Sequence, residues 1–289
     1  MNNKEDILKQ KVFIIFILIS LISLLLIACG QNGKKPDDPV DNADAQRRSE
    51  QEEAERRERI EIIKNATSSY VKKVLGYHND ANWNGEIADF THIISVFSRV
   101  PHRVANDGTE FLYYDLMDDN RAKESKAERR EVYLALGYDN DFIWVLGGFA
   151  SKLIGTVDLL TKNKDKLKDF FIKIRNAAKA YYIDVYDTLE KKLDNLESLS
   201  AAELKSLSIK LGEVKTARVK LIVRVVRPLR NEYLITRRYL SDPNAIIPVN
   251  ITADEVLEYW NTLSAEFDSI CNEIIRLGGE IKEILTRAN

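Results

Sequence analysis

The chain has 289 residues, with 43 Lys and Arg residues against 45 Asp and Glu residues, which gives a formal net charge of −2. This near-neutral balance argues against nucleic-acid binding, which needs a strongly basic surface. The length suffices for one large domain or two small ones with a sizeable core.

An apolar run of 17 residues, positions 12–28, lies near the start of the chain and is interrupted only by Ser20 and Ser23. Three basic residues precede it: Lys4, Lys9 and Lys11. A basic flank, a short apolar core and a small residue before a break are typical of an export signal. The run is also at the lower limit of what can span a membrane, so an uncleaved membrane helix is the alternative.

The residues that end this run, Leu26-Ile27-Ala28-Cys29, resemble a bacterial lipobox. The resemblance implies that residues 1–28 are a signal peptide and that Cys29 receives a diacylglycerol and a further acyl chain such as palmitate. Such lipid chains would hold the protein on a membrane without a transmembrane segment. Cys271 is then the remaining cysteine, so we expect no intramolecular disulfide and a fold that depends on packing.

A polar segment follows the predicted acylation site. It contains Pro36 and Pro39, and Val40 is its only large apolar side chain. It cannot bury a core, so residues 29–49 are predicted to be a flexible tether. From residue 50, three Glu residues each stand four positions before an Arg, as Glu52, Glu53 and Glu55 before Arg56, Arg57 and Arg59. This spacing favours a solvated helix at the start of a domain that covers residues 50–289.

This domain shows the apolar spacing of three and four residues that is typical of amphipathic helices. We therefore predict an all-α fold, a single bundle of about seven helices. The helical segments are expected over residues 60–74, 87–100, 109–136, 142–160, 167–189, a helix through 221–226 that Pro228 kinks or ends, and the pair 252–277 and 280–287. Capping boxes begin at Ser200 and at Thr252, and Gly278-Gly279 is expected to separate the last two helices.

The central segment carries a resemblance to a known family. Residues 129–138, RREVYLALGY, and then 143–153 resemble the corresponding part of a paralogous family of borrelial outer-surface lipoproteins, which includes the complement regulator-acquiring surface protein that captures factor H. The resemblance implies a helical bundle exposed on the cell outer membrane of a spirochaete, where it meets host or tick molecules. Family members differ in ligand, so no binding residue is carried over.

No enzyme site is recognised, and we predict no catalytic residues, cofactor or metal. His78, His92 and His102 lack the spacing of a helical zinc pair. Asp115, Asp118 and Asp119 do not form a calcium loop and are interpreted as a solvated helix end. Gly147-Gly148 lacks the Lys-Ser/Thr of a phosphate loop and is expected to permit close helix packing.

A basic stripe between residues 205 and 238 is the candidate ligand site, with Lys215, Arg218, Lys220 and Arg224 at its centre. On a near-neutral protein it could attract an acidic ligand, such as a glycosaminoglycan or an acidic face of a serum protein. The alternative is an ordinary solvated helix face. Trp83 is a second candidate, either as an exposed anchor for a partner or as a lid on the domain.

The sequence is therefore compatible with two functions. The first is a non-enzymatic binding module, whose partner could be a host complement regulator, plasminogen, a glycosaminoglycan or a tick receptor, in complement evasion or adhesion. The second is a structural or antigenic surface coat protein without a high-affinity ligand. A homodimer through the C-terminal helix is a further hypothesis, in which Cys271 could pair between chains, although its apolar neighbours favour a buried thiol.

Overall fold

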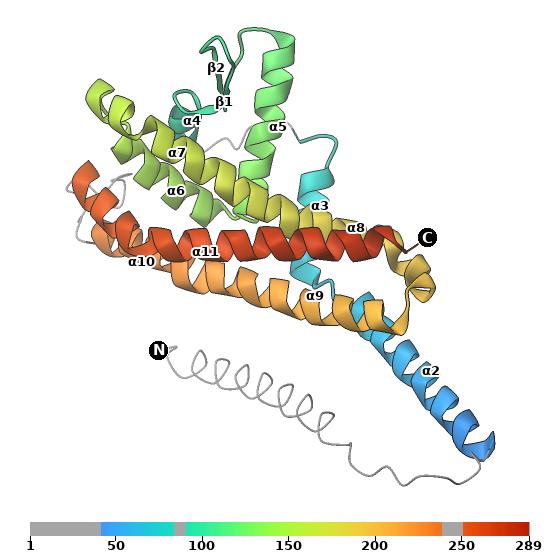
Figure 1. Cartoon of the computed structure of the whole chain (residues 1–289). Helices are drawn as coiled ribbons and strands as arrows, with labels where there is room; N and C mark the ends of the chain where they lie inside the picture. Colours follow the sequence, from blue (N-terminus) through green and yellow to red (C-terminus); the bar gives the residue numbers. More distant parts are fainter. Residues whose placement is uncertain (1–41, 84–90, 239–250, 289) are drawn as a thin grey trace. The chain divides into compact units, whose positions relative to one another are not determined.

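The computed structural model describes residues 42–83, 91–238 and 251–288 (Figure 1). The predicted signal peptide, Cys29 and the tether up to residue 41 lie outside these residues. The chain divides into two compact units, residues 1–51 and 52–289.

The fold is all-α apart from one small hairpin, as predicted. The α-helices are α2 (Asn42–Lys64), α3 (Ser69–Asn79), α4 (Thr91–Phe97), α5 (Asp119–Ala135), α6 (Asn140–Leu153), α7 (Val157–Ala178), α8 (Thr188–Lys192), α9 (Ala201–Leu221), α10 (Arg227–Arg238) and α11 (Ala253–Thr286). Two π-helical stretches, η1 (Lys179–Asp187) and η3 (Ile222–Val226), and the 3-10 helix η2 (Leu193–Ser198) join some of them, and strands β1 (Pro101–Val104) and β2 (Glu110–Leu112) form the hairpin.

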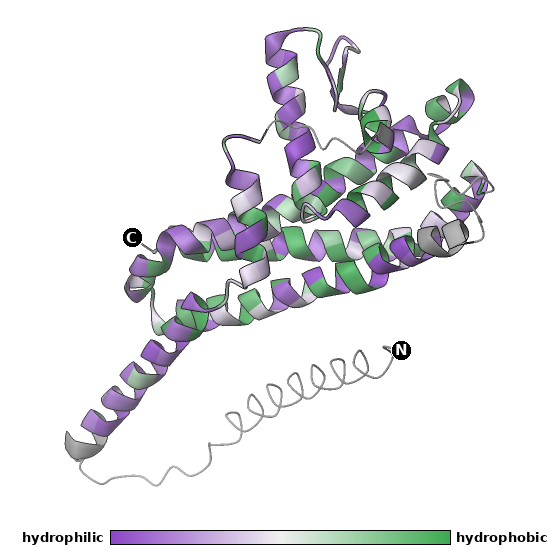
Figure 2. Ribbon diagram, turned by 180° about the vertical axis from the view of Figure 1, so that it is seen from behind, coloured by the Kyte–Doolittle hydropathy of each residue, from purple (hydrophilic) through white to green (hydrophobic). Residues whose placement is uncertain are grey.

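Helix α11 is central to the bundle, since it packs against α9, α7 and η1 (Figure 1). Its buried face repeats at helical spacing, with Phe267, Ile270, Ile274, Leu277 and Ile281 at most 4% exposed. Hydrophobic residues gather on the faces that the long helices turn toward one another, whereas α2 is mostly hydrophilic (Figure 2). The bundle is thus held by burial of apolar surface.

The helix expected over residues 109–136 is wrong in its first part. Strand β1 pairs antiparallel with β2, with Pro101 opposite Leu112 and Val104 opposite Glu110. The turn between them contains Gly108, whose φ of +83° suits glycine. Helix α5 begins only after Asp118, whose side chain accepts hydrogen bonds from two main-chain amides of the first turn.

The segment expected as one helix over residues 142–160 is interrupted at 154–156. Helix α6 ends at Leu153, and Thr156 caps α7 by accepting a hydrogen bond from the Leu159 amide. The helix through 221–226 is confirmed, but it takes a π-helical form there and continues past Pro228 as α10. Proline has no backbone N–H to donate, and the wider turns of the preceding π-helix accommodate the loss of this hydrogen bond.

The expected break at Gly278-Gly279 is also wrong, because α11 runs through both residues to Thr286. Gly278 faces Ala180 of η1, where a Cβ atom would stand 2.8 Å from the Ala180 Cβ. This glycine therefore serves close packing and not helix termination. Both predicted capping boxes, at Ser200 and Thr252, are confirmed.

The last part of the predicted tether is helical. Helix α2 starts at Asn42 and therefore includes residues 42–49. The polar sequence of this stretch is compatible with a solvated helix because Glu and Arg at a spacing of four residues can pair, as Glu53 and Arg57 do at 2.5 Å.

Candidate functional site

Two large apolar side chains are exposed on the loop that joins β2 to α5. Leu116 is 67% exposed and Met117 is 80% exposed. Helix α5 packs against α7 and crosses the long helices of the bundle at a steep angle, and the hairpin lies beside the outer end of α5 (Figures 1 and 2). Adjacent exposed apolar residues on such a projection are typical of a protein-interaction surface.

The loop that presents them is held in place by side-chain contacts. The Asp115 carboxylate accepts a hydrogen bond from the Met117 amide at 3.1 Å and pairs with the Arg121 guanidinium at 2.5 Å. The Ser125 hydroxyl donates to the Asp115 carbonyl oxygen at 3.2 Å. The expectation that Asp115 lies on a solvated helix end is therefore wrong, since its side chain is only 3% exposed. Leu116 and Met117 are presented on an ordered scaffold.

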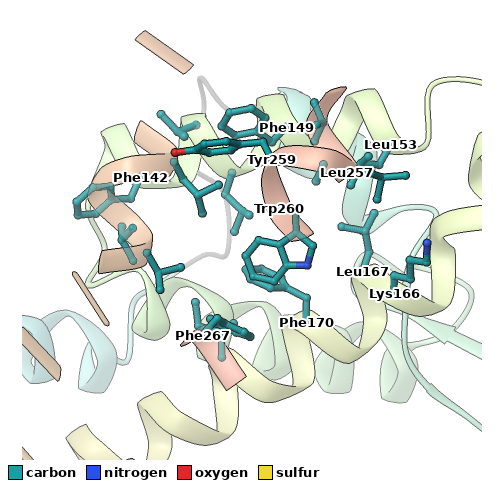
Figure 3. A pocket seen from close by; sticks show the side chains of 18 of the residues that line it. Phe142, Phe149, Leu153, Lys166, Leu167, Phe170, Leu257, Tyr259, Trp260 and Phe267 are labelled. Atoms are coloured by element: carbon teal, nitrogen blue, oxygen red, sulfur yellow. The ribbon is translucent and has the colours of Figure 1, made fainter. Parts of the chain in front are cut away.

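An apolar pocket of about 190 Å³ lies among α6, α7, η3, α10 and α11 (Figure 3). Three aromatic rings form its floor. The Trp260 ring meets the rings of Phe170 and Phe267 edge to face, with a centroid distance of 5.2 Å in each pair. The Phe170 and Phe267 rings stack on each other at a centroid distance of 5.1 Å. Most of the remaining lining is aliphatic or aromatic as well. Lys166, Tyr259 and Asn261 supply polar side chains to the lining.

The basic stripe does not form one free surface. Arg218 is only 7% exposed and turns inward, so its assignment to a surface ligand site is wrong. Lys220 and Arg224 approach carboxylates of α11, Glu273 at 3.7 Å and Glu266 at 2.7 Å. Lys215 is exposed. Much of the stripe therefore lies at the contact between α9 and α11 and is offset by acidic neighbours.

The three histidines lie apart. His78 shares a hydrogen bond with the Tyr138 hydroxyl at 3.0 Å, and burial lowers its pKa. Burial also lowers the pKa of His92, and it lowers that of His102 to about 4. Within residues 42–83, 91–238 and 251–288, no three His, Cys, Asp or Glu side chains gather in a way that could hold a metal ion.

A buried ionic cluster links α5 and α7 below the hairpin. The Arg175 guanidinium pairs with Glu131 at 2.7 Å and with Glu128, and it donates to the Tyr113 hydroxyl at 2.9 Å. Burial raises the pKa of Glu128, while nearby Arg175 opposes this rise. Because every member has a partner, the cluster is interpreted as a structural support for the hairpin.

Trp83 lies against the domain and is only partly exposed. Its ring meets Tyr133 edge to face at 5.8 Å, and the Arg130 guanidinium lies 5.1 Å from its centroid. Its interpretation as a lid is thus favoured over that of a free anchor. Cys271 is fully buried, and burial raises the pKa of its thiol to about 12.

Sequence reasoning missed both the exposed pair and the pocket. Leu116 and Met117 precede the N-cap residue Asp118, where an apolar side chain often packs onto the first turn of the helix, so no local pattern predicts their exposure. The pocket has no local signal, because its lining comes from several helices that are distant in the sequence.

Among the described residues, no helix is long and apolar enough to cross a membrane.

Comparison with known proteins identifies a family. The model of a family described as Borrelia Bbcrasp-1 domain containing protein matches residues 93–286. This range includes the hairpin, the loop with Leu116 and Met117, and the whole lining of the pocket. No curated protein and no solved structure matches the chain.

Proposed function

The chain belongs to the Borrelia Bbcrasp-1 domain family, and we propose that it is a non-enzymatic binding module displayed on the outer surface of the cell. In this proposal acylated Cys29 anchors the protein in the outer membrane after removal of residues 1–28. The family is consistent with a surface lipoprotein, and the lipobox-like sequence before Cys29 supports the mode of attachment.

The exposed pair Leu116 and Met117 is the observation that carries the binding role. These side chains are 67% and 80% exposed although both are apolar, and their loop is fixed by Asp115 and Arg121. Burial of two such side chains by a partner would contribute about 1.5–3 kcal/mol each. The partner is proposed to be a host or tick protein, with a complement regulator, plasminogen and a tick receptor as the candidates.

Replacement of the pair by charged residues tests this role. A soluble chain that begins at Gly30 is immobilised and exposed to serum and to tick gut extract, and any captured protein is then titrated in purified form. We expect one saturable partner that the double variant Leu116→Glu, Met117→Glu binds at least tenfold more weakly.

Val157 provides a matched control, because it is also apolar and 79% exposed but lies at the start of α7. The Val157→Glu variant should retain binding. Equal losses in both variants would show that the loop is not the contact. The absence of any saturable partner would instead support a coat protein without a high-affinity ligand.

The anchor is tested separately in cells. Metabolic labelling with a palmitate analogue should mark the native protein and leave a Cys29→Ala variant unlabelled. Protease added to intact cells should remove the labelled protein if it faces outward. A protein that stays membrane-bound without label would favour the uncleaved helix over residues 12–28.

A further inference from the structure

We propose that the apolar pocket between α6, α7 and α11 is a binding site for a free fatty carboxylate of medium chain length. This site differs from the loop that carries the proposed function and shares no residue with it. The pocket volume of about 190 Å³ exceeds the cavity of about 150 Å³ that is known to admit benzene. It is thus large enough for an alkyl chain and too small for a folded peptide segment.

The lining explains why the tail should be apolar. Trp260, Phe170 and Phe267 form an aromatic floor, and aliphatic residues such as Leu153, Leu167 and Val226 supply most of the rest. A space walled in this way has few partners for ordered water, so an apolar group gains free energy by filling it. In Figure 3 the labelled side chains converge on the pocket from several helices.

Lys166 explains why the head group should be an anion. It lines the pocket at the end near Leu153 and Leu257, opposite Phe142 (Figure 3). Other lysines of α7 are neutralised, with Lys162 next to Asp254 at 3.7 Å and Lys168 next to Asp165 at 2.9 Å. Lys166 forms no ion pair with a carboxylate in the part of the chain that the structure describes.

The arrangement therefore combines an apolar pocket with one ammonium group at its rim. A carboxylate held there would keep contact with water while its tail enters the pocket, which avoids the cost of burying a charge. A neutral alcohol of the same length would gain the apolar contacts without the attraction to Lys166. Octanoate and octanol are thus a matched pair of probes.

Calorimetry with the soluble chain from Gly30 tests the assignment. Octanoate should bind saturably at one site per chain and more tightly than octanol, and it should change the fluorescence of Trp260. In Trp260→Phe the fluorescence change should disappear while calorimetric binding persists. If octanoate does not bind saturably, or binds no better than octanol, the assignment is overturned.

Variants locate the site. Lys166→Glu should weaken octanoate binding roughly fivefold and leave octanol unchanged, as expected for loss of one exposed ionic contact. Lys215→Glu, an exposed charge reversal on α9, is the matched control and should change neither. Val226→Phe fills the pocket and should remove both ligands, with circular dichroism as a check of folding.

Equal loss of octanoate affinity in Lys166→Glu and Lys215→Glu would overturn the proposal, and this comparison holds even if Val226→Phe fails to fold. The Leu116→Glu, Met117→Glu variant should bind octanoate as the native chain does. Failure of the pocket and failure of the proposed partner site are therefore distinguishable.

Discussion

The guanidinium of Arg218, on α9, donates a hydrogen bond from Nη2 to the main-chain carbonyl oxygen of Ala135 at 3.0 Å. Ala135 is the last residue of α5, where carbonyl groups have no donor within the helix. A cation at this position also interacts favourably with the negative end of the helix dipole. The guanidinium lies near the rings of Tyr181 and Tyr182, at 5.8 and 5.6 Å. Arg218 thus caps a helix that is distant in the sequence.

Loss of this cap should destabilise the fold. In Arg218→Met the Ala135 carbonyl would remain buried without this donor, which we expect to lower the free energy of unfolding by about 1–3 kcal/mol. Urea denaturation followed by circular dichroism measures the change. The control is Lys215→Met, on the same helix but exposed, which should stay within about 0.5 kcal/mol of the native chain. Similar losses in both variants would contradict the capping role.

The two adjacent glycines of α11 should respond in opposite directions to the same substitution. At Gly278 a Cβ atom would stand 2.8 Å from the Ala180 Cβ and 2.9 Å from its carbonyl oxygen, so Gly278→Ala should cost about 1–3 kcal/mol. At Gly279 a Cβ atom would meet nothing within 4 Å. Gly279→Ala should therefore stabilise the helix by about 0.5–1 kcal/mol.

Thermal unfolding of both variants distinguishes close packing from helix termination. If Gly278-Gly279 ended a helix, both substitutions would be unfavourable or neutral. A stabilised Gly278→Ala variant would show that η1 and α11 are not in close contact at Ala180.

The features that the sequence predicted correctly depend on residues that are close together in the sequence. Both capping boxes need only Ser or Thr and a Glu three positions later. Gly147 was expected to permit close packing, and a Cβ atom there would lie 2.8 Å from the Ile93 amide nitrogen. Such patterns identify the local structure without knowledge of the fold.

Arg218 was misplaced although a signal was present. It follows Leu211 and Val214 at helical spacing and precedes Leu221 by three, and all three are buried. Its position on the apolar face of α9 indicates burial, even though its charge favours exposure. The hairpin was missed because β2 spans only three residues, too few to distinguish an alternating pattern from helical spacing.

The buried thiol of Cys271 should be nearly inert in the native protein. Burial raises its pKa to about 12, so the reactive thiolate is about a thousandfold less abundant than for an ordinary thiol. We expect Ellman's reagent to react slowly in native buffer and quickly in denaturant, and non-reducing electrophoresis to show a single chain. Rapid native labelling or a disulfide-linked dimer would contradict the buried position and would revive pairing between chains through α11.

His102 should make the fold sensitive to mild acid. Burial lowers its pKa to about 4, and the guanidinium groups of Arg175 and Arg103 act in the same direction, while Glu124 and Asp115 oppose them. Well above pH 6.5 the imidazole is neutral in both states and contributes no pH dependence. Between pH 6.5 and about 4 the unfolded chain takes up the proton and the folded chain does not, so stability falls as the pH falls.

The His102→Phe variant isolates this contribution. The new ring would remain near Phe111 and Tyr113, which lie 6.3 and 5.7 Å from the His102 ring centroid. We expect the free energy of unfolding of the native chain to decrease, relative to the variant, by up to about 1.4 kcal/mol per pH unit between pH 6 and 4.5. His78 and His92 are present in both proteins, so their titration cancels in the difference. Parallel curves over this range would show that His102 accepts a proton in the folded state as readily as in the unfolded chain.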